Sequence, residues 1–290
     1  MADIFSELEG LGISQDTDKE IFESNAKNAE VKKTKTLPKA KQLTPEQILF
    51  TAKMTCPVCK KEVEFRAVKS GKARLMKTEL DLRPIYTILD PSMYEVVCCN
   101  NCGYAALKKD FTSLSPKKID IIKKKVSPNY LGRNYPDIYS YDNAIERYKL
   151  ALYDAMITDA KDGEKAYLCL RIAWLYRGSY ESDENLSPEK KNDLVSNEKV
   201  FLAHALEGFK QAHYKEGFPI AGMDEVTLKY LIGELCRRQG NYEEASRWIS
   251  EVIVAKGSNR RLKDKAIEVK ELIKNSKNNR QNEQTDVDEK

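Results

Sequence analysis

The sequence has few of the side chains and motifs that commonly carry catalysis. Only two of its 290 residues are histidines, His204 and His213. At about 100° per residue, their spacing puts them on opposite faces of one predicted helix, so they do not form a shared metal site. The sequence contains no P-loop, no His-Glu-x-x-His and no Gly-x-Ser-x-Gly. We therefore expect a protein that is not an enzyme.

Long apolar runs are also missing. No run approaches the roughly 20 residues of a membrane-spanning helix, and the first residues lack the basic start and apolar centre of a secretory signal. We expect a cytoplasmic protein without a membrane partner. In that reducing compartment the seven cysteines are not a disulfide framework. This favours metal binding for the paired cysteines and simple burial for Cys169 and Cys236.

Four cysteines form two Cys-x-x-Cys pairs, Cys56 with Cys59 and Cys99 with Cys102. This spacing lets one tight turn direct both thiolates at a single ion, so two such turns supply the four soft ligands of a tetrahedral Zn²⁺ site. Four thiolates fill the coordination sphere, and the zinc is therefore expected to be structural. A redox dithiol is the alternative, but it requires a pair at a helix N-terminus in a βαβ setting. Cys98 is an alternative ligand to Cys99, which we prefer because only Cys99 has the two-residue spacing.

The residues around the two pairs predict the rest of a zinc ribbon. Thr44-Pro45-Glu46-Gln47 has the composition of a capping box with proline at the first helical position, so a short helix should precede the first pair. Alternating apolar residues over 63–68 and the run 94–98 predict two strands. Gly103 suits the turn that closes the second pair.

Beyond Phe111 the pattern becomes helical and contains a repeat. A small, large, small triplet with offsets of four and seven occurs three times, as Ala144/Tyr148/Ala151, Ala205/Phe209/Ala212 and Ala245/Ile249/Val252. Such spacing lets the second helix of a hairpin pack closely on its neighbours, which predicts tetratricopeptide-like helical hairpins. Ser187-Pro188 is expected to start a long helix, whereas Pro128 and Pro136 argue against a helix before the first triplet.

Together these patterns predict an α+β, mainly α fold in which a small four-cysteine zinc ribbon precedes a tetratricopeptide-like helical-hairpin array. The expected boundaries are a disordered acidic and Lys-rich tail at 1–43, a zinc-ribbon module at 44–112, a helical domain at 113–274 and a disordered polar tail at 275–290. The net charge of +4 is uneven, because residues 31–80 contain thirteen Lys or Arg against four Glu.

Several motifs occur in an order that resembles a known family. They are Cys56-Pro-Val-Cys59, Asp81-Leu-Arg83 with Tyr86, the run Tyr94 to Ala105, Gly222-Met-Asp-Glu, and the run Tyr230 to Ala245. In these motifs the chain resembles the bacterial family termed domain of unknown function 2225, over roughly residues 44–275. The resemblance implies a bacterial origin, a zinc-ribbon start and a tetratricopeptide-like body, but no activity. Cys236 departs from the family, whose Gly-Glu-Leu-x-Arg-Arg run tends to carry Tyr there.

Five residues are candidates for a ligand groove between the ribbon and the repeats. Such a groove would capture a peptide or an acidic ligand. The alternative is that the tyrosines complete the core and the arginines pair with nearby carboxylates. The candidates are Arg83, Tyr86 and Tyr94 between the two cysteine pairs, and Arg237 and Arg238 in a repeat helix.

Our leading functional hypothesis is a non-enzymatic cytoplasmic adaptor whose helical repeats bind a protein or peptide on their concave face. A nucleic-acid-binding protein that uses the basic segment 32–77 is the first alternative. It is disfavoured because the rest of the chain is nearly neutral and affinity for nucleic acid grows with the number of phosphates neutralised. The second alternative is an enzyme of unknown reaction with its site at the junction of ribbon and repeats.

Overall fold

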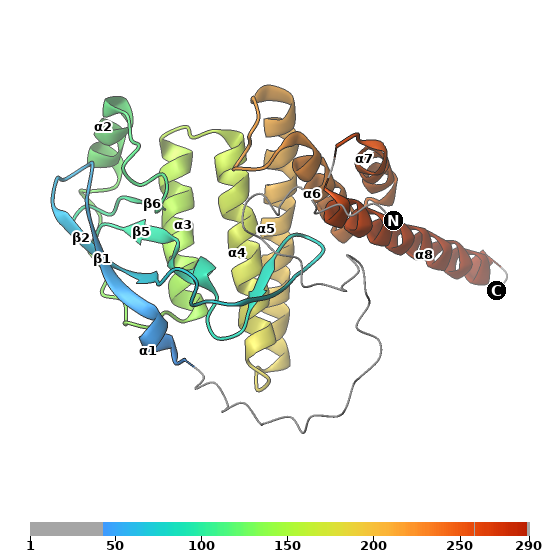
Figure 1. Ribbon diagram of the computed structural model, residues 1–290, viewed down its shortest axis with the longest axis horizontal. Coiled ribbons are helices and arrows are strands. Elements are labelled where there is room, and N and C mark those ends of the chain that lie inside the picture. The colour runs from blue at the N-terminus through green and yellow to red at the C-terminus, as the bar shows by residue number, and fades with distance from the viewer. Residues whose placement is uncertain (1–42, 258, 289–290) are drawn as a thin grey trace, which may run out of the picture. The chain divides into compact units, whose positions relative to one another are not determined.

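The computed structural model describes residues 43–257 and 259–288 (Figure 1). The fold is α+β and mainly α, as predicted. The segments predicted as a ribbon module at 44–112 and a helical domain at 113–274 belong, in the described residues, to one compact unit. The predicted N-terminal tail at 1–43 lies, apart from Leu43, outside the described residues. In the described part of the chain, no helix has the length and apolar character needed to cross a membrane.

The strands form three separate antiparallel pairs. The two cysteine pairs occupy the turns of the first and last hairpins, so each pair lies between two strands. The sequence predicted only the strand after the first pair and the strand before the second. The pairs are β1 (Leu49–Thr55) with β2 (Glu62–Val68), β3 (Leu75–Thr78) with β4 (Pro84–Tyr86), and β5 (Val96–Cys98) with β6 (Ala105–Leu107).

Helices make up most of the remaining chain. The first two are the short α1 (Pro45–Ile48), where the Thr44 amide donates to Gln47 Oε1 as the capping box predicts, and α2 (Pro116–Lys125). A 3-10 turn, η2, precedes β5. The remaining helices and the turn are η2 (Pro91–Tyr94), α3 (Tyr141–Ile157), α4 (Asp162–Ser182), α5 (Pro188–Lys215), α6 (Glu225–Arg238), α7 (Tyr242–Val254) and α8 (Arg260–Asp288).

Serine side chains cap the starts of α3 and α5, and the long helices pack on their neighbours in chain order. Ser140 Oγ accepts the Asn143 amide at the start of α3, and Ser187 Oγ accepts the Lys190 amide at the start of α5. Helices α3, α4 and α5 lie side by side, and α6 packs on α7 (Figure 1). The three predicted triplets fall on α3, α5 and α7, while their classification as tetratricopeptide-like repeats stays a prediction.

The C-terminal end differs from its prediction. Residues 275–290 are polar and were expected to form a disordered tail, but α8 continues to Asp288. Within that stretch Ser276 Oγ donates to the Leu272 carbonyl and Lys277 Nζ pairs with Glu243 on α7. Polar composition alone did not reveal these contacts with the preceding helix turn and with α7.

Candidate metal centre

The four cysteines of the two pairs converge on one point. Their sulfur atoms all lie within 4.8 Å of one another. The Sγ atoms of Cys56 and Cys102 are 3.6 Å apart, and those of Cys59 and Cys99 are 3.5 Å apart, so both close contacts join one hairpin to the other. A tetrahedral ion with metal–sulfur bonds of about 2.3 Å separates its ligands by about 3.8 Å. The quartet can therefore hold one metal ion.

Each cysteine pair sits in the same kind of turn. The Lys60 amide donates to the Cys56 carbonyl at 3.0 Å, and the Gly103 amide donates to the Cys99 carbonyl at 2.9 Å. The residue after each pair has a positive φ, 63° at Lys60 and 80° at Gly103. At Gly103 a Cβ atom would also meet the ring of Tyr130 at 2.7 Å. Glycine at this position thus satisfies both the backbone conformation and the close approach of a side chain.

Cys98 points away from the quartet. Side chains alternate along a strand, so Val97 and Cys99 join the core around the cysteine quartet, whereas Cys98 joins the core shared with α3 and α4. Burial raises the pKa of Cys98 to about 11, which keeps it a neutral thiol. Within the quartet the Cys102 thiol, followed by the Cys56 thiol, lowers the pKa of Cys99 by hydrogen bonding. The geometry places Cys99, and not Cys98, among the candidate ligands.

Three side chains of α3 hold the β5–β6 hairpin and the turn before it on the helical part of the fold. Asp154 Oδ2 accepts the Ala105 amide at 2.7 Å, and Arg147 Nη2 donates to the Val96 carbonyl at 2.5 Å. The Tyr148 hydroxyl donates to the Ser92 carbonyl at 2.9 Å. These bonds join backbone groups of η2, β5 and β6 directly to side chains of α3. The cysteine-bearing turn is thereby held on a rigid helix.

Because of Asp154, the free energy of unfolding is expected to depend on pH. Burial raises the pKa of Asp154 to about 7 from its ordinary value of 3.8, although the Ala105 amide opposes the shift. Between these two values the unfolded chain binds fewer protons than the folded chain, so the free energy of unfolding falls as the pH rises. An Asp154→Asn variant keeps an acceptor for the Ala105 amide and does not titrate. From pH 4 to 7 the wild type should lose stability relative to this variant, on the order of 2 kcal/mol.

Urea denaturation of both proteins at several pH values in this range tests the expectation. Any effect of acid on the cysteine quartet is common to the two proteins and cancels in the difference. Parallel stability curves for the wild type and Asp154→Asn would show that Asp154 does not titrate in this window.

Four of the five candidate groove residues have hydrogen-bond or ion-pair partners within the chain. Arg83 is buried and lies 2.6 Å from Glu181, while Arg237 and Arg238 both pair with Glu234. Tyr94 lies in the core, where its ring stacks on Tyr139 at 4.6 Å and its hydroxyl accepts the Tyr139 amide. Tyr86 is half-buried on β4 beside a small cavity that Arg83 also lines. The structure brings the three arginines close to one buried acidic cluster and leaves both tyrosines outside it.

That cluster is centred on Asp81, which belongs to the segment between β3 and β4. Its side chain is fully buried and accepts a hydrogen bond from Trp174 Nε1 at 3.1 Å. Arg177 Nη2 lies 2.7 Å from its carboxylate, and Arg238 Nε lies 3.6 Å from it. The segment therefore inserts an acidic side chain among basic groups of α4 and α6.

Backbone groups of the same segment are also bound by the helices. The Tyr230 hydroxyl of α6 donates to the Leu80 carbonyl at 2.7 Å, and Lys265 Nζ of α8 donates to the Thr78 carbonyl at 2.8 Å. Leu80 and Leu82 pack against the core of helices α4 to α8. Residues 78–83 of the chain itself therefore occupy this surface of α4, α6 and α8. The sequence had suggested a helix surface of this kind as the binding site of a partner peptide. Only the family resemblance had drawn attention to Asp81, and no periodicity indicated where this segment docks.

One comparison with known proteins gives a match. A family model described as an uncharacterized protein conserved in bacteria, domain of unknown function 2225, matches residues 49–273. The match covers more than half of the chain and includes all four candidate ligands and the segment around Asp81. No curated protein and no solved structure matches the chain.

Proposed function

We propose that this chain, which belongs to the bacterial family termed domain of unknown function 2225, is a non-enzymatic cytoplasmic adaptor built around one structural Zn²⁺. Zinc is the proposed metal because four thiolates at near-tetrahedral separations suit an ion without a geometric preference of its own. Four protein ligands leave no position for water or substrate. The ion would hold the two cysteine-bearing hairpins together.

An apolar groove with a basic rim is the observation that supports binding of a protein partner. It has a volume of about 480 Å³, and its floor combines Met54 of β1, Leu107 of β6 and Tyr167 of α4. Lys108 and Lys109 lie at its edge and are exposed, with Lys109 Nζ 5.5 Å from the centroid of the Tyr167 ring. Apolar surface bordered by charge is typical of an interaction site.

The charge of the rim indicates what occupies the groove. The only carboxylate among the lining residues, Glu95, is already paired with Arg171 at 2.6 Å. Lys108 and Lys109 form no ion pair within the described part of the chain. An acidic protein segment with one large apolar side chain complements both the floor and the rim. We take such a segment as the partner that the adaptor binds.

Charge reversal at the rim provides the test. Selection of a displayed random peptide library on the zinc-loaded full chain should enrich acidic sequences with one large apolar residue. Their affinity should fall about tenfold or more in the double variant Lys108→Glu/Lys109→Glu. The matched control is Lys190→Glu/Lys191→Glu, which makes the same change in net charge at two adjacent exposed lysines of α5 and should leave binding intact.

Two outcomes would contradict the proposal. One is a selection in which the enriched peptides bind both double variants equally well. The other is an absence of peptide enrichment together with steeply salt-dependent binding to DNA or RNA, which would favour the nucleic-acid alternative. Part of the basic segment 32–77 is already engaged within the chain, since Lys53 lies 2.8 Å from both Glu62 and Glu64.

A further inference from the structure

Among the described residues four arginines are buried, and one of them differs from the others in lacking an acidic partner. Arg147, with 3% of its surface exposed, has no carboxylate of the described chain within ion-pair distance. Burial of an unpaired charge is costly, which is why the others are paired. Their partners are Glu181 for Arg83 at 2.6 Å, Glu95 for Arg171 at 2.6 Å, and Asp81 for Arg177 at 2.7 Å.

The contacts of Arg147 leave part of its guanidinium unused. Its central carbon lies 4.8 Å from the centroid of the Tyr135 ring and 4.6 Å from that of Tyr139. Nη2 donates to the Val96 carbonyl, but Nε is buried and has no hydrogen-bond partner among the described residues. Aromatic faces attract the positive charge, yet they do not replace an oxygen acceptor for the free N–H.

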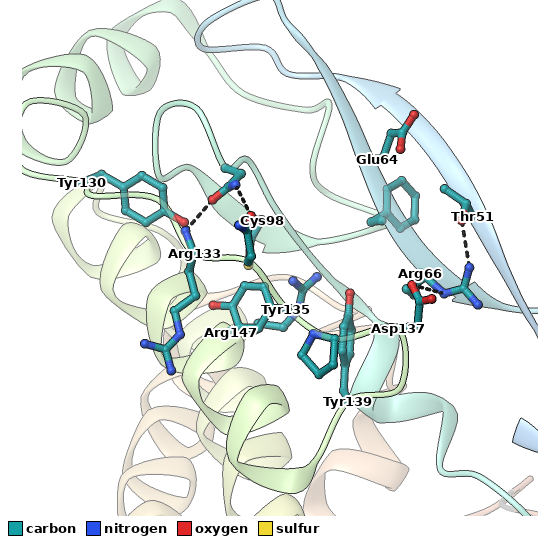
Figure 2. Close-up of a pocket in the computed structure, with 14 residues that line it drawn as sticks. Thr51, Glu64, Arg66, Cys98, Tyr130, Arg133, Tyr135, Asp137, Tyr139 and Arg147 are labelled. Carbon is teal, nitrogen blue, oxygen red and sulfur yellow. Dashed lines mark hydrogen bonds and ion pairs between the residues drawn. The ribbon is translucent and has the colours of Figure 1, made fainter. Parts of the chain in front are cut away.

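Arg147 lines a cavity of about 350 Å³. This cavity is separate from the proposed partner groove and shares no lining residue with it. Two further arginines line it, Arg66 from β2 and Arg133 from the loop before α3. Figure 2 shows Arg147 beside Tyr135 and Tyr139, with Arg66 and Arg133 on opposite sides of it. Arginines from three separate segments therefore line one cavity.

Other polar groups around the cavity also lack partners. Arg66 Nε is buried without a hydrogen bond in the described structure, and its nearest carboxylate is Asp137 at 3.9 Å. The Tyr130 hydroxyl is likewise buried and unpartnered there, and it points toward the other lining residues (Figure 2). Buried donors are normally satisfied by protein groups, ordered water or a ligand, so several unpartnered donors at one cavity are compatible with a bound acceptor there. Arg133 at the rim is paired with Glu146 at 2.9 Å.

We infer that this cavity binds a small organic oxyanion, whose carboxylate or phosphate oxygens accept hydrogen bonds from Arg147, Arg66 and Tyr130. Arginine is suited to either group because its planar fork pairs with two oxygens at once. The site also adjoins the candidate metal centre, since Asn100, between two of the four cysteines, accepts the Arg133 amide at 2.5 Å. This ligand is additional to the proposed protein partner and binds at a different place.

Calorimetric titration of the metal-loaded full chain with inorganic phosphate and with citrate, at constant ionic strength, tests the inference. At least one anion should bind with a stoichiometry of one. Arg147→Gln should weaken that binding about tenfold or more, because a charged hydrogen-bond donor is lost. Competition between the two probes identifies the charged group of the ligand. If phosphate binds and citrate does not displace it, the ligand is a phosphorylated compound. If citrate binds and phosphate does not displace it, the ligand is a carboxylate.

A second variant separates binding from folding, because Arg147→Gln also removes the hydrogen bond to Val96. Tyr130→Phe deletes only a hydroxyl without a partner in the described structure, so its thermal stability should match the wild type while its affinity falls severalfold. Tyr153→Phe is the matched control, since Tyr153 is exposed on α3 and does not line the cavity. Absence of heat with both anions at millimolar concentration, or equal affinities in the wild type and Tyr130→Phe, would overturn the inference.

Discussion

Replacement of Cys99 by serine is expected to abolish metal binding and to unfold the two hairpins that meet at the cysteine quartet. A serine hydroxyl is a far poorer zinc ligand than a thiolate, and three ligands do not close a tetrahedral structural site. The strands β5 and β6 contain only three residues each, so few backbone hydrogen bonds hold this hairpin together without the metal. In small zinc modules the metal contributes on the order of 10 kcal/mol to folding, so its loss has a large effect.

Cys98 provides the matched control for this experiment. Cys98→Ser makes the same chemical change one residue away, in the core beneath α3, and should retain the metal at a cost of about 1 kcal/mol. Metal content of the purified variants and hydrogen exchange of the amides in residues 49–107 report the two effects. Full metal occupancy in Cys99→Ser, or loss of metal in Cys98→Ser alone, would show that the ligand set is wrong.

Replacement of Asp81 by alanine is expected to destabilise the fold by about 3–5 kcal/mol. The change leaves Arg177 buried without one of its acidic partners and leaves Trp174 Nε1 without an acceptor. It also releases the anchor that holds residues 78–83 on α4, α6 and α8. Glu181→Ala is the control, because Glu181 pairs with Arg83 but its side chain is 44% exposed, and such pairs contribute about 1 kcal/mol or less.

The contribution of Asp81 also has a defined pH dependence. Burial acts to raise the pKa of Asp81, but Arg177 and Arg238 hold it below its ordinary value of 3.8. A lowered pKa means that the stabilisation is fully present above pH 4 and is lost as the pH falls through and below that value. Urea denaturation at neutral and acidic pH should therefore show a difference between the wild type and Asp81→Ala that narrows in acid. If Asp81→Ala and Glu181→Ala lowered the free energy of unfolding by the same amount, the result would contradict a central role for Asp81.

The candidate metal centre was predictable because its information is local. Each Cys-x-x-Cys pair determines one turn, and the two-residue spacing to Cys102 selects Cys99 over Cys98 without any knowledge of the fold. The start of α5 was similarly marked by Ser187, whose side chain caps the helix. Local chemistry of this kind does not depend on distant partners.

The position of residues 78–83 could not be predicted, because every interaction that fixes it spans a large part of the chain. Lys265 binds the Thr78 carbonyl across 187 residues, and Tyr230 binds the Leu80 carbonyl across 150 residues. Hydrophobic periodicity reports which face of a helix is buried but not which segment covers it. The partner of Arg83, Glu181, was therefore invisible until the helices were placed, whereas Glu234 lies only three and four residues before Arg237 and Arg238 on the same helix.

Arg147 was hidden for a related reason. It lies inside the triplet of α3, next to Tyr148, where the small, large, small pattern directs attention to packing. Its distinctive property is that no carboxylate of the described residues pairs with it. The cavity beside it is formed in part by Arg66 and by the loop before α3, which are distant in sequence or belong to another element. No single segment of the sequence contains this cavity.

X-ray absorption at the zinc edge, combined with native mass spectrometry of the same sample, is the most direct test of a metal ion held by both hairpins. We predict one zinc per chain with four sulfur neighbours at about 2.3 Å and no nitrogen or oxygen neighbour. A folded chain whose native mass contains no metal would contradict this, as would a spectrum that requires mixed sulfur and oxygen ligands.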